Sequence, residues 1–176
     1  MIARSLDIYA LAKLTLEEGS RPYAVVAGEL EMSASEFHAA VKRLGQAGLV
    51  DPKDRRIRQG AVREFLIHGL RYVFPAGMGG LTRGVPTSYA APPLSEFITF
   101  GKENIPVWPD ALGESIGYGV EPLHPSAPKA ARRDGRLYEL LALLDALRES
   151  RNRERKIAID ELMKSCLLYT SPSPRD

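Results

Sequence analysis

Apolar residues recur at helical spacing three times within the first third of the chain. The first series predicts a helix over residues 6–16, which Gly19 stops. A second predicted helix covers 23–30, and Pro22 stands just before its first turn, where a missing N–H costs little. The third series predicts a helix over about 33–47. The pattern therefore indicates a unit of short helices at the start of the chain.

The third helix carries the clearest local signal. Ser33 and Glu36 match a capping box, in which the Ser33 hydroxyl accepts from the Glu36 N–H and the Glu36 carboxylate accepts from the Ser33 N–H. Met32 and Phe37 are placed on either side of that box as a hydrophobic staple. Gly48 supplies a left-handed cap after the last turn. Local sequence thus specifies both ends of this helix.

Residues 25–41 resemble the helix-turn-helix of MarR-type and related winged-helix regulators of bacteria. The turn in that family usually carries glycine where this chain has Glu31, and a left-handed residue other than glycine costs about 1 kcal/mol. The resemblance implies a DNA-binding fold. Its core positions are matched here by Val26, Ala27, Leu30, Met32, Phe37 and Ala40.

The segment after the third helix extends the resemblance. Residues 42–50 have the form with which winged-helix regulators end the recognition helix, and 51–59 fit a short hairpin wing that turns at 52–54. A fourth helix is predicted over 61–73. Residues 1–73 are therefore expected to form a winged helix-turn-helix domain.

Positive charge is concentrated in the same part of the chain. The formal net charge is only +2, yet residues 42–63 contain seven basic residues against two acidic ones. Such an excess attracts an anionic partner. A helix in the major groove presents its N-terminal residues to base edges, while nearby cations meet phosphates. We expect contacts to double-stranded DNA: base contacts from Ser33, Ser35, His38 and Ala39, and backbone contacts from Lys42, Arg43, Lys53, Arg55, Arg56 and Arg58.

Two other interpretations of residues 1–73 stay open. A trihelical unit can serve for protein contact alone, and a basic hairpin can be a solvated loop. Because one module of this size binds DNA with modest affinity, a homodimer that contacts two half-sites is expected.

Residues 74–133 are poor in charge and rich in Pro and Gly. They hold too many apolar residues for a disordered linker, so a packed, largely extended and irregular extension is predicted. Short strands are expected at 107–108 and 115–123. Residues 69–94 also resemble a group of bacterial winged-helix proteins that have no assigned ligand.

One polar feature stands out in this extension. Thr82, Arg83 and Gly84 are expected to form a loop whose N–H groups and guanidinium converge on an anion or on a partner's carboxylate. The alternative is that Arg83 donates to carbonyls of the surrounding chain.

Residues 134–165 are predicted to form a long C-terminal helical segment capped by Asp134. Its apolar stripe packs either on the chain's own core or on a second copy, as the terminal helices of MarR-type dimers do. This stripe consists of Leu137, Leu140, Leu141, Leu144 and Leu147. Residues 166–176 resemble a translated sequencing adapter, so they are left out of the fold prediction.

Candidate catalytic chemistry is sparse. The single cysteine lies in the adapter-like segment, and His38, His68 and His124 stand too far apart for a metal pair. No cofactor motif is recognised. No apolar run approaches the roughly 20 residues that a membrane helix needs, so a cytoplasmic location is expected.

The fold class expected is mainly α with a small β wing. The expected function is sequence-specific DNA binding by a dimeric transcriptional regulator. The alternative is an antitoxin-like or other protein-binding module whose partner is encoded nearby. A ligand sensor, with a pocket between the extension and the last helix, has less support, and an enzyme has the least.

Overall fold

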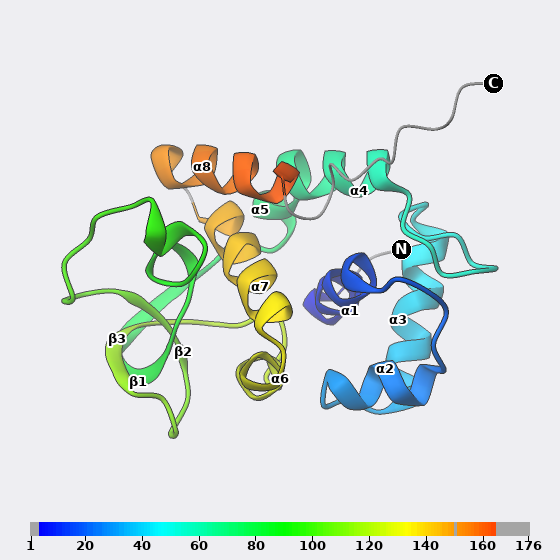
Figure 1. Cartoon of the computed structure of the whole chain (residues 1–176), viewed down its shortest axis with the longest axis horizontal. Coiled ribbons are helices and arrows are strands. Elements are labelled where there is room, and N and C mark those ends of the chain that lie inside the picture. Colours follow the sequence, from blue (N-terminus) through cyan, green and yellow to red (C-terminus); the bar gives the residue numbers. More distant parts are fainter. Residues whose placement is uncertain (1–3, 150, 165–176) are drawn as a thin grey trace.

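The computed structural model describes residues 4–149 and 151–164, and Figure 1 shows how the elements are arranged. The adapter-like segment 166–176 lies outside the described residues. Helices make up 54% of the described residues, which also contain one small sheet of three strands. The coarse prediction, a mainly helical chain with a small amount of β structure, is confirmed.

The three helices predicted at the start of the chain are present as α1 (Ser5–Leu16), α2 (Tyr23–Glu29) and α3 (Ala34–Gln46). α3 packs on both of the others. Glu31 is left-handed between α2 and α3, with φ 55°, and Gly48 is left-handed after α3, with φ 77°. The predicted turn and cap therefore have the backbone conformation expected for them.

A tight hairpin follows α3. An isolated antiparallel bridge joins Val50 to Ile57, and the Asp51 N–H donates to the Arg56 carbonyl over 2.8 Å. The predicted turn is present, but its arms form a single bridge instead of two strands. The predicted fourth helix is divided into α4 (Gln59–Glu64) and α5 (Leu70–Val73), which a π-helical turn, η1 (Phe65–Gly69), connects.

The extension contains a sheet that closes on itself. β1 is antiparallel to β2 and to β3, and these two pair with each other in parallel. The strands predicted from the sequence are confirmed as β2 and β3, whereas β1 lies where a loop was expected. The strands are β1 (Met78–Pro86), β2 (Pro106–Pro109) and β3 (Ser115–Val120), with the short helical turns η2 (Ser88–Ala90) and η3 (Leu94–Glu96) between β1 and β2.

Helices α6 (Ala127–Arg133), α7 (Gly135–Arg148) and α8 (Asn152–Leu162) complete the described fold. The Asp134 carboxylate caps α7 as predicted, accepting from the Leu137 N–H over 3.1 Å. α6 begins in a proline-rich stretch where no helix was expected. Its Pro128 lies in the first turn of the helix, where proline is tolerated.

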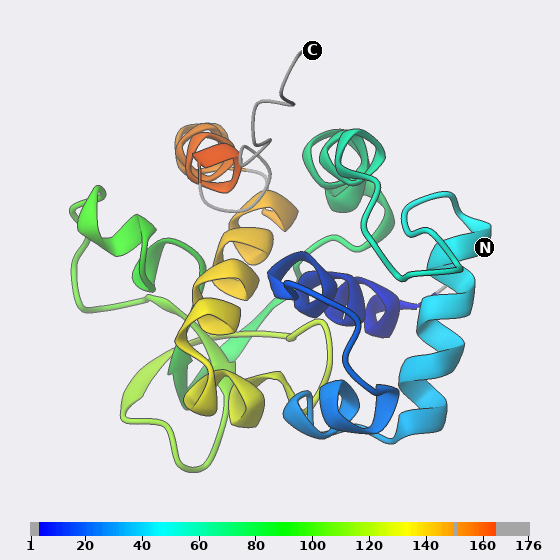
Figure 2. The same ribbon diagram turned by 45° about the vertical axis from the view of Figure 1, so that its right-hand side comes forward.

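α7 runs through the centre of the molecule, with α1 on one side and the sheet on the other (Figures 1 and 2). Leu143 and Ala146, which stand outside the predicted stripe, are buried as fully as Leu140 and Leu144 within it. Every residue of α7 from Leu140 to Arg148 is buried, so this part of the helix lies inside the protein. The stripe packs on the chain's own core, which is the first of the two arrangements expected for it.

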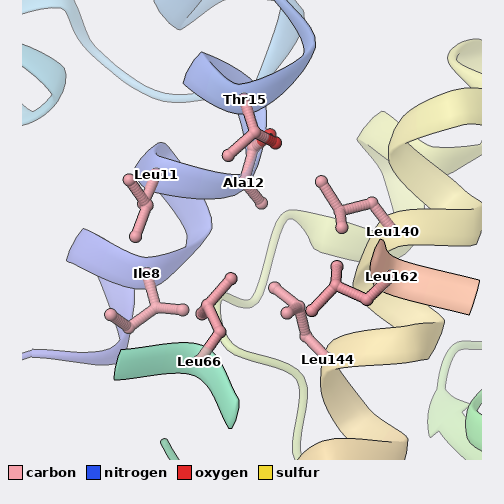
Figure 3. A pocket seen from close by; sticks show the side chains of 8 residues that line it. All are labelled: Ile8, Leu11, Ala12, Thr15, Leu66, Leu140, Leu144 and Leu162. Atoms are coloured by element: carbon pink, nitrogen blue, oxygen red, sulfur yellow. The ribbon is translucent and has the colours of Figure 1, made fainter. Parts of the chain in front are cut away.

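One hydrophobic core joins all three predicted segments, 1–73, 74–133 and 134–165. Leu11 of α1, Trp108 of β2 and Leu144 of α7 all belong to it. A small cavity of about 10 Å³ remains between α1, η1, α7 and α8. That volume is at the lower limit for a single water molecule, so this cavity is too small for an organic ligand. Figure 3 shows its lining, which is Ile8, Leu11, Ala12, Thr15, Leu66, Leu140, Leu144 and Leu162.

A buried polar cluster fixes the sheet to α7. The fully buried carboxylate of Asp145 accepts from the Thr87 hydroxyl over 2.6 Å and from the Trp108 indole N–H over 2.7 Å. Its second oxygen accepts from Arg148 over 2.7 Å. A buried charge is tolerated when it is paired and hydrogen-bonded in this way. The cluster therefore sets the position of the sheet, on the side of α7 away from α1.

Candidate nucleic-acid interface

One side of α3 is exposed to solvent along its whole length. Ser33, Ser35, His38 and Lys42 are exposed, and Ala39 is half-buried. Figures 1 and 2 place α3 at the edge of the molecule farthest from the sheet, and none of the described elements lies over its outer side. Its inner side is anchored by the buried residues Phe37, Ala40, Val41 and Leu44.

The start of α3 is held by the predicted capping box. The Glu36 N–H donates to Ser33 Oγ over 3.2 Å, and the Ser33 N–H donates to Glu36 Oε2 over 3.1 Å. Hydrogen bonds from Ser33, above all from its backbone N–H, lower the pKa of Glu36, so this carboxylate is ionised at neutral pH. Ser33 Oγ serves the cap, whereas the Ser35 hydroxyl lies 3.2 Å from Ser33 Oγ and takes no part in the capping box. Of the two serines, Ser35 has the hydroxyl better placed to contact another molecule.

His38 is positioned by an aromatic neighbour. Its ring lies 5.0 Å from that of Tyr23 on α2. The guanidinium of Arg55 stacks on the same tyrosine, 4.4 Å from the ring centroid, and donates to the Arg21 carbonyl over 2.5 Å. These contacts tie the hairpin to α2. Arg55 therefore has internal partners that hold its guanidinium beside Tyr23.

Arg43 also has an internal partner. Its guanidinium donates to both carboxylate oxygens of Asp7 on α1, over 2.7 to 3.0 Å. Asp7 is fully buried, whereas the Arg43 side chain is 23% exposed. The hydrogen bonds to Asp7 raise the pKa of Arg43. Its Nε and Nη2 donors therefore hold α1 to α3.

The hairpin carries the remaining predicted cations. Lys53, Arg56 and Arg58 are all exposed, and the Arg56 side chain is 86% exposed, with its Nε 3.5 Å from Asp54 Oδ2. Asp54 also accepts from the Arg56 N–H over 3.0 Å, which shapes the turn. These three side chains are therefore directed to solvent, beside the C-terminal end of α3.

Thr82, Arg83 and Gly84 do not join this surface. They lie within β1, so the loop predicted there is corrected to a strand, whose backbone pairs with β3 and β2. A Cβ at Gly84 would overlap the Trp108 carbonyl, so glycine is required there by close strand packing. Arg83 donates to the Gly113 carbonyl over 3.3 Å, which is the contact of the alternative interpretation.

α6 meets the turn between α2 and α3, which the sequence did not predict. The carboxylate of Glu31 pairs with Lys129 Nζ at 3.2 Å and with Arg133 Nη1 at 2.5 Å. The basic residues of α6 are recognisable in the sequence, but their position beside Glu31 depends on how α6 packs. The structure thus brings these two cations to the N-terminal end of α3.

Comparison with protein-family models, with curated proteins and with solved structures found no match. Among residues 4–149 and 151–164, no three His, Cys, Asp or Glu side chains are grouped as a metal would require. Within the same ranges, no helix has both the length and the apolar character of a membrane span.

Proposed function

We propose that the chain binds double-stranded DNA, with α2 and α3 as a helix-turn-helix and the hairpin as its wing. The observation that carries this proposal is the outer side of α3, which is polar, uncovered and bordered by exposed cations. A helix of about 10–12 Å diameter matches a major groove about 12 Å wide. The small side chains of Ser35 and Ala39 allow this helix to approach the bases closely.

Each residue of the interface has a distinct role. Ser35, His38 and Ala39 face the base edges, while Ser33 mainly fixes the helix start. Lys42, Lys53, Arg56 and Arg58 neutralise phosphates. Each neutralised phosphate contributes about −0.9 to the slope of log affinity against log salt, so these four residues of one protomer contribute about −3.6 to that slope. Arg43 and Arg55 are left out because Asp7 and Tyr23 hold their guanidinium groups.

Fluorescence anisotropy with a labelled duplex of random sequence tests this proposal. Binding is measured between about 50 and 200 mM salt, the range in which such contacts change affinity strongly. In the triple variant K53A/R56A/R58A, we expect the slope to become less steep by about 2.7. The matched control K102A/R153A/K156A removes three exposed cations elsewhere and should keep the slope. Absence of binding by the wild type at low salt would reject the proposal.

Sequence preference is assigned to α3. Selection from a random duplex library followed by sequencing should give a defined site for the wild type. S35A and H38A are expected to change that site, whereas the hairpin variant should weaken binding to every sequence alike. Recovery of the upstream region of the chain's own gene would support a role in transcriptional regulation, for which we propose a dimer.

Binding of another protein is the second candidate function, and the sheet favours it. Leu81 on β1 is 64% exposed and Ile116 on β3 is 53% exposed. Leu81 pairs with Tyr118 and Ile116 pairs with Arg83, so the two apolar residues lie two pairs apart in the β1–β3 ladder. Leu112, in the loop between β2 and β3, is 77% exposed. Exposed apolar side chains on one small sheet are typical of a protein contact surface. Sedimentation velocity of the wild type and of L81K/I116K identifies what binds this surface of the sheet. If a second copy of the chain binds there, the wild type is a dimer and the variant is a monomer. If a different protein binds there, the wild type is a monomer.

A further inference from the structure

The turn between α2 and α3 is joined to α6 by an ion-pair cluster. Lys129 and Arg133 approach the carboxylate of Glu31 from a helix about a hundred residues away in the sequence. Both cations remain largely in solvent, with side-chain exposures of 60% and 67%, while Glu31 is 21% exposed. Two positive charges thus share one carboxylate and leave a positive excess on the surface.

This cluster lies at the end of α3 opposite the hairpin. Glu31 precedes the cap residue Ser33 by two positions, and the hairpin begins just after Gly48. Figures 1 and 2 show α6 beside the end of α2 that leads into α3. Exposed cations therefore stand near both ends of α3. A duplex held by its major groove presents a phosphate backbone on each side of that groove.

We propose that Lys129 and Arg133 form a second set of contacts to the DNA backbone, so that α6 and the hairpin bind phosphates on the two sides of the groove that α3 occupies. This inference rests on the proposed function. In free protein, the Glu31 carboxylate occupies both cations. In the complex, the Arg133 guanidinium and the Lys129 ammonium donate hydrogen bonds to phosphate oxygens. The Glu31 carboxylate competes with the phosphates for these donors.

A purely structural role for the cluster makes a different prediction. If the ion pairs only fastened α6 to the turn, removal of either side would disturb the interface in the same direction. If the cations bind phosphate, removing them weakens binding, whereas removing the competing carboxylate strengthens it. Exposed ion pairs contribute little to stability, so these variants are expected to remain folded, and circular dichroism melting of each variant verifies this.

The test uses the full chain and the same labelled random duplex at several salt concentrations. K129A/R133A should bind more weakly, with a salt slope less steep by about 1.8, which corresponds to two phosphate contacts. E31Q should bind more tightly than the wild type. R153A/K156A removes two exposed cations of α8 as a matched control and should keep the wild-type slope.

Each outcome decides between the two roles. An unchanged slope for K129A/R133A, or weaker binding by E31Q, overturns the inference. The proposed function survives such a result if K53A/R56A/R58A still lowers the slope, so the two failures are distinguishable. Loss of duplex binding by the wild type would reject both.

Discussion

The adjacent residues Lys42 and Arg43 are predicted to respond in opposite ways to substitution. Both are basic and both belong to α3, but Lys42 is exposed while Arg43 is bonded to the buried Asp7. Removing one partner of a buried ion pair costs about 3–5 kcal/mol, because the other charge stays buried without compensation. Since the Arg43 side chain is 23% exposed, water can partly solvate Asp7 in R43M, and we expect a loss of about 2–3 kcal/mol.

Urea unfolding measures this difference. A small domain has a free energy of unfolding of about 5–15 kcal/mol, so R43M remains folded at 25 °C and its midpoint shifts clearly at a constant m value. K42A should stay within about 0.5 kcal/mol of the wild type. The double variant D7L/R43M should recover most of the loss, because an apolar pair replaces the ion pair.

DNA binding by the same two variants completes the comparison. K42A should make the salt slope less steep by about 0.9, whereas R43M should keep the wild-type slope. The reasoning is refuted if R43M loses less than about 1 kcal/mol of stability and reduces the slope as K42A does. Arg43 would then be a phosphate contact, as the sequence alone predicts.

Two further predictions concern stability. Burial raises the pKa of Glu149 to about 7, so between its usual pKa and this value the folded state keeps a proton that the unfolded state releases. The stability that this group contributes is therefore present at low pH and is lost as pH rises, by about 3 kcal/mol between pH 4.5 and 8. Urea unfolding of the wild type and of E149Q over this pH range measures the contribution of Glu149, because groups such as His124 affect both proteins alike. Equal pH dependence of the unfolding free energy in the two proteins would contradict this prediction. G84A places a Cβ against the Trp108 carbonyl and should lower the free energy of unfolding by at least about 2 kcal/mol. G80A has open space around its Cβ and should change that free energy by about 0.5 kcal/mol or less. The fluorescence of the single tryptophan follows unfolding of both variants, and equal losses would contradict the close packing of β1 on β2.

The sequence predicted those elements whose signals are local. The capping box at Ser33, the left-handed Gly48 and the cap at Asp134 each depend on residues within a few positions of one another. The spacing of apolar residues predicted α1, α2 and most of α7. These parts include the exposed side of α3, on which the proposed function depends.

The sequence did not predict features that depend on long-range packing. β1 pairs with residues 21 to 25 positions later in β2 and 31 to 42 positions later in β3, and its glycines give it no alternating pattern. The burial of Leu143 depends on tertiary packing around α7, which contacts α1, α6, α8 and η2. The internal partners of Arg43 and Arg55 are likewise set by tertiary structure, and so is the meeting of Glu31 with α6.

The central claim, that α3 and the hairpin form the DNA-binding surface, is tested most directly by NMR. Amide resonances of the ¹⁵N-labelled protein are followed while a short duplex is added at low salt. The account predicts that the largest shifts fall within residues 33–42 and 51–59, with a smaller group in α6. Shifts confined to the sheet, or shifts that leave α3 unchanged at saturation, would contradict it.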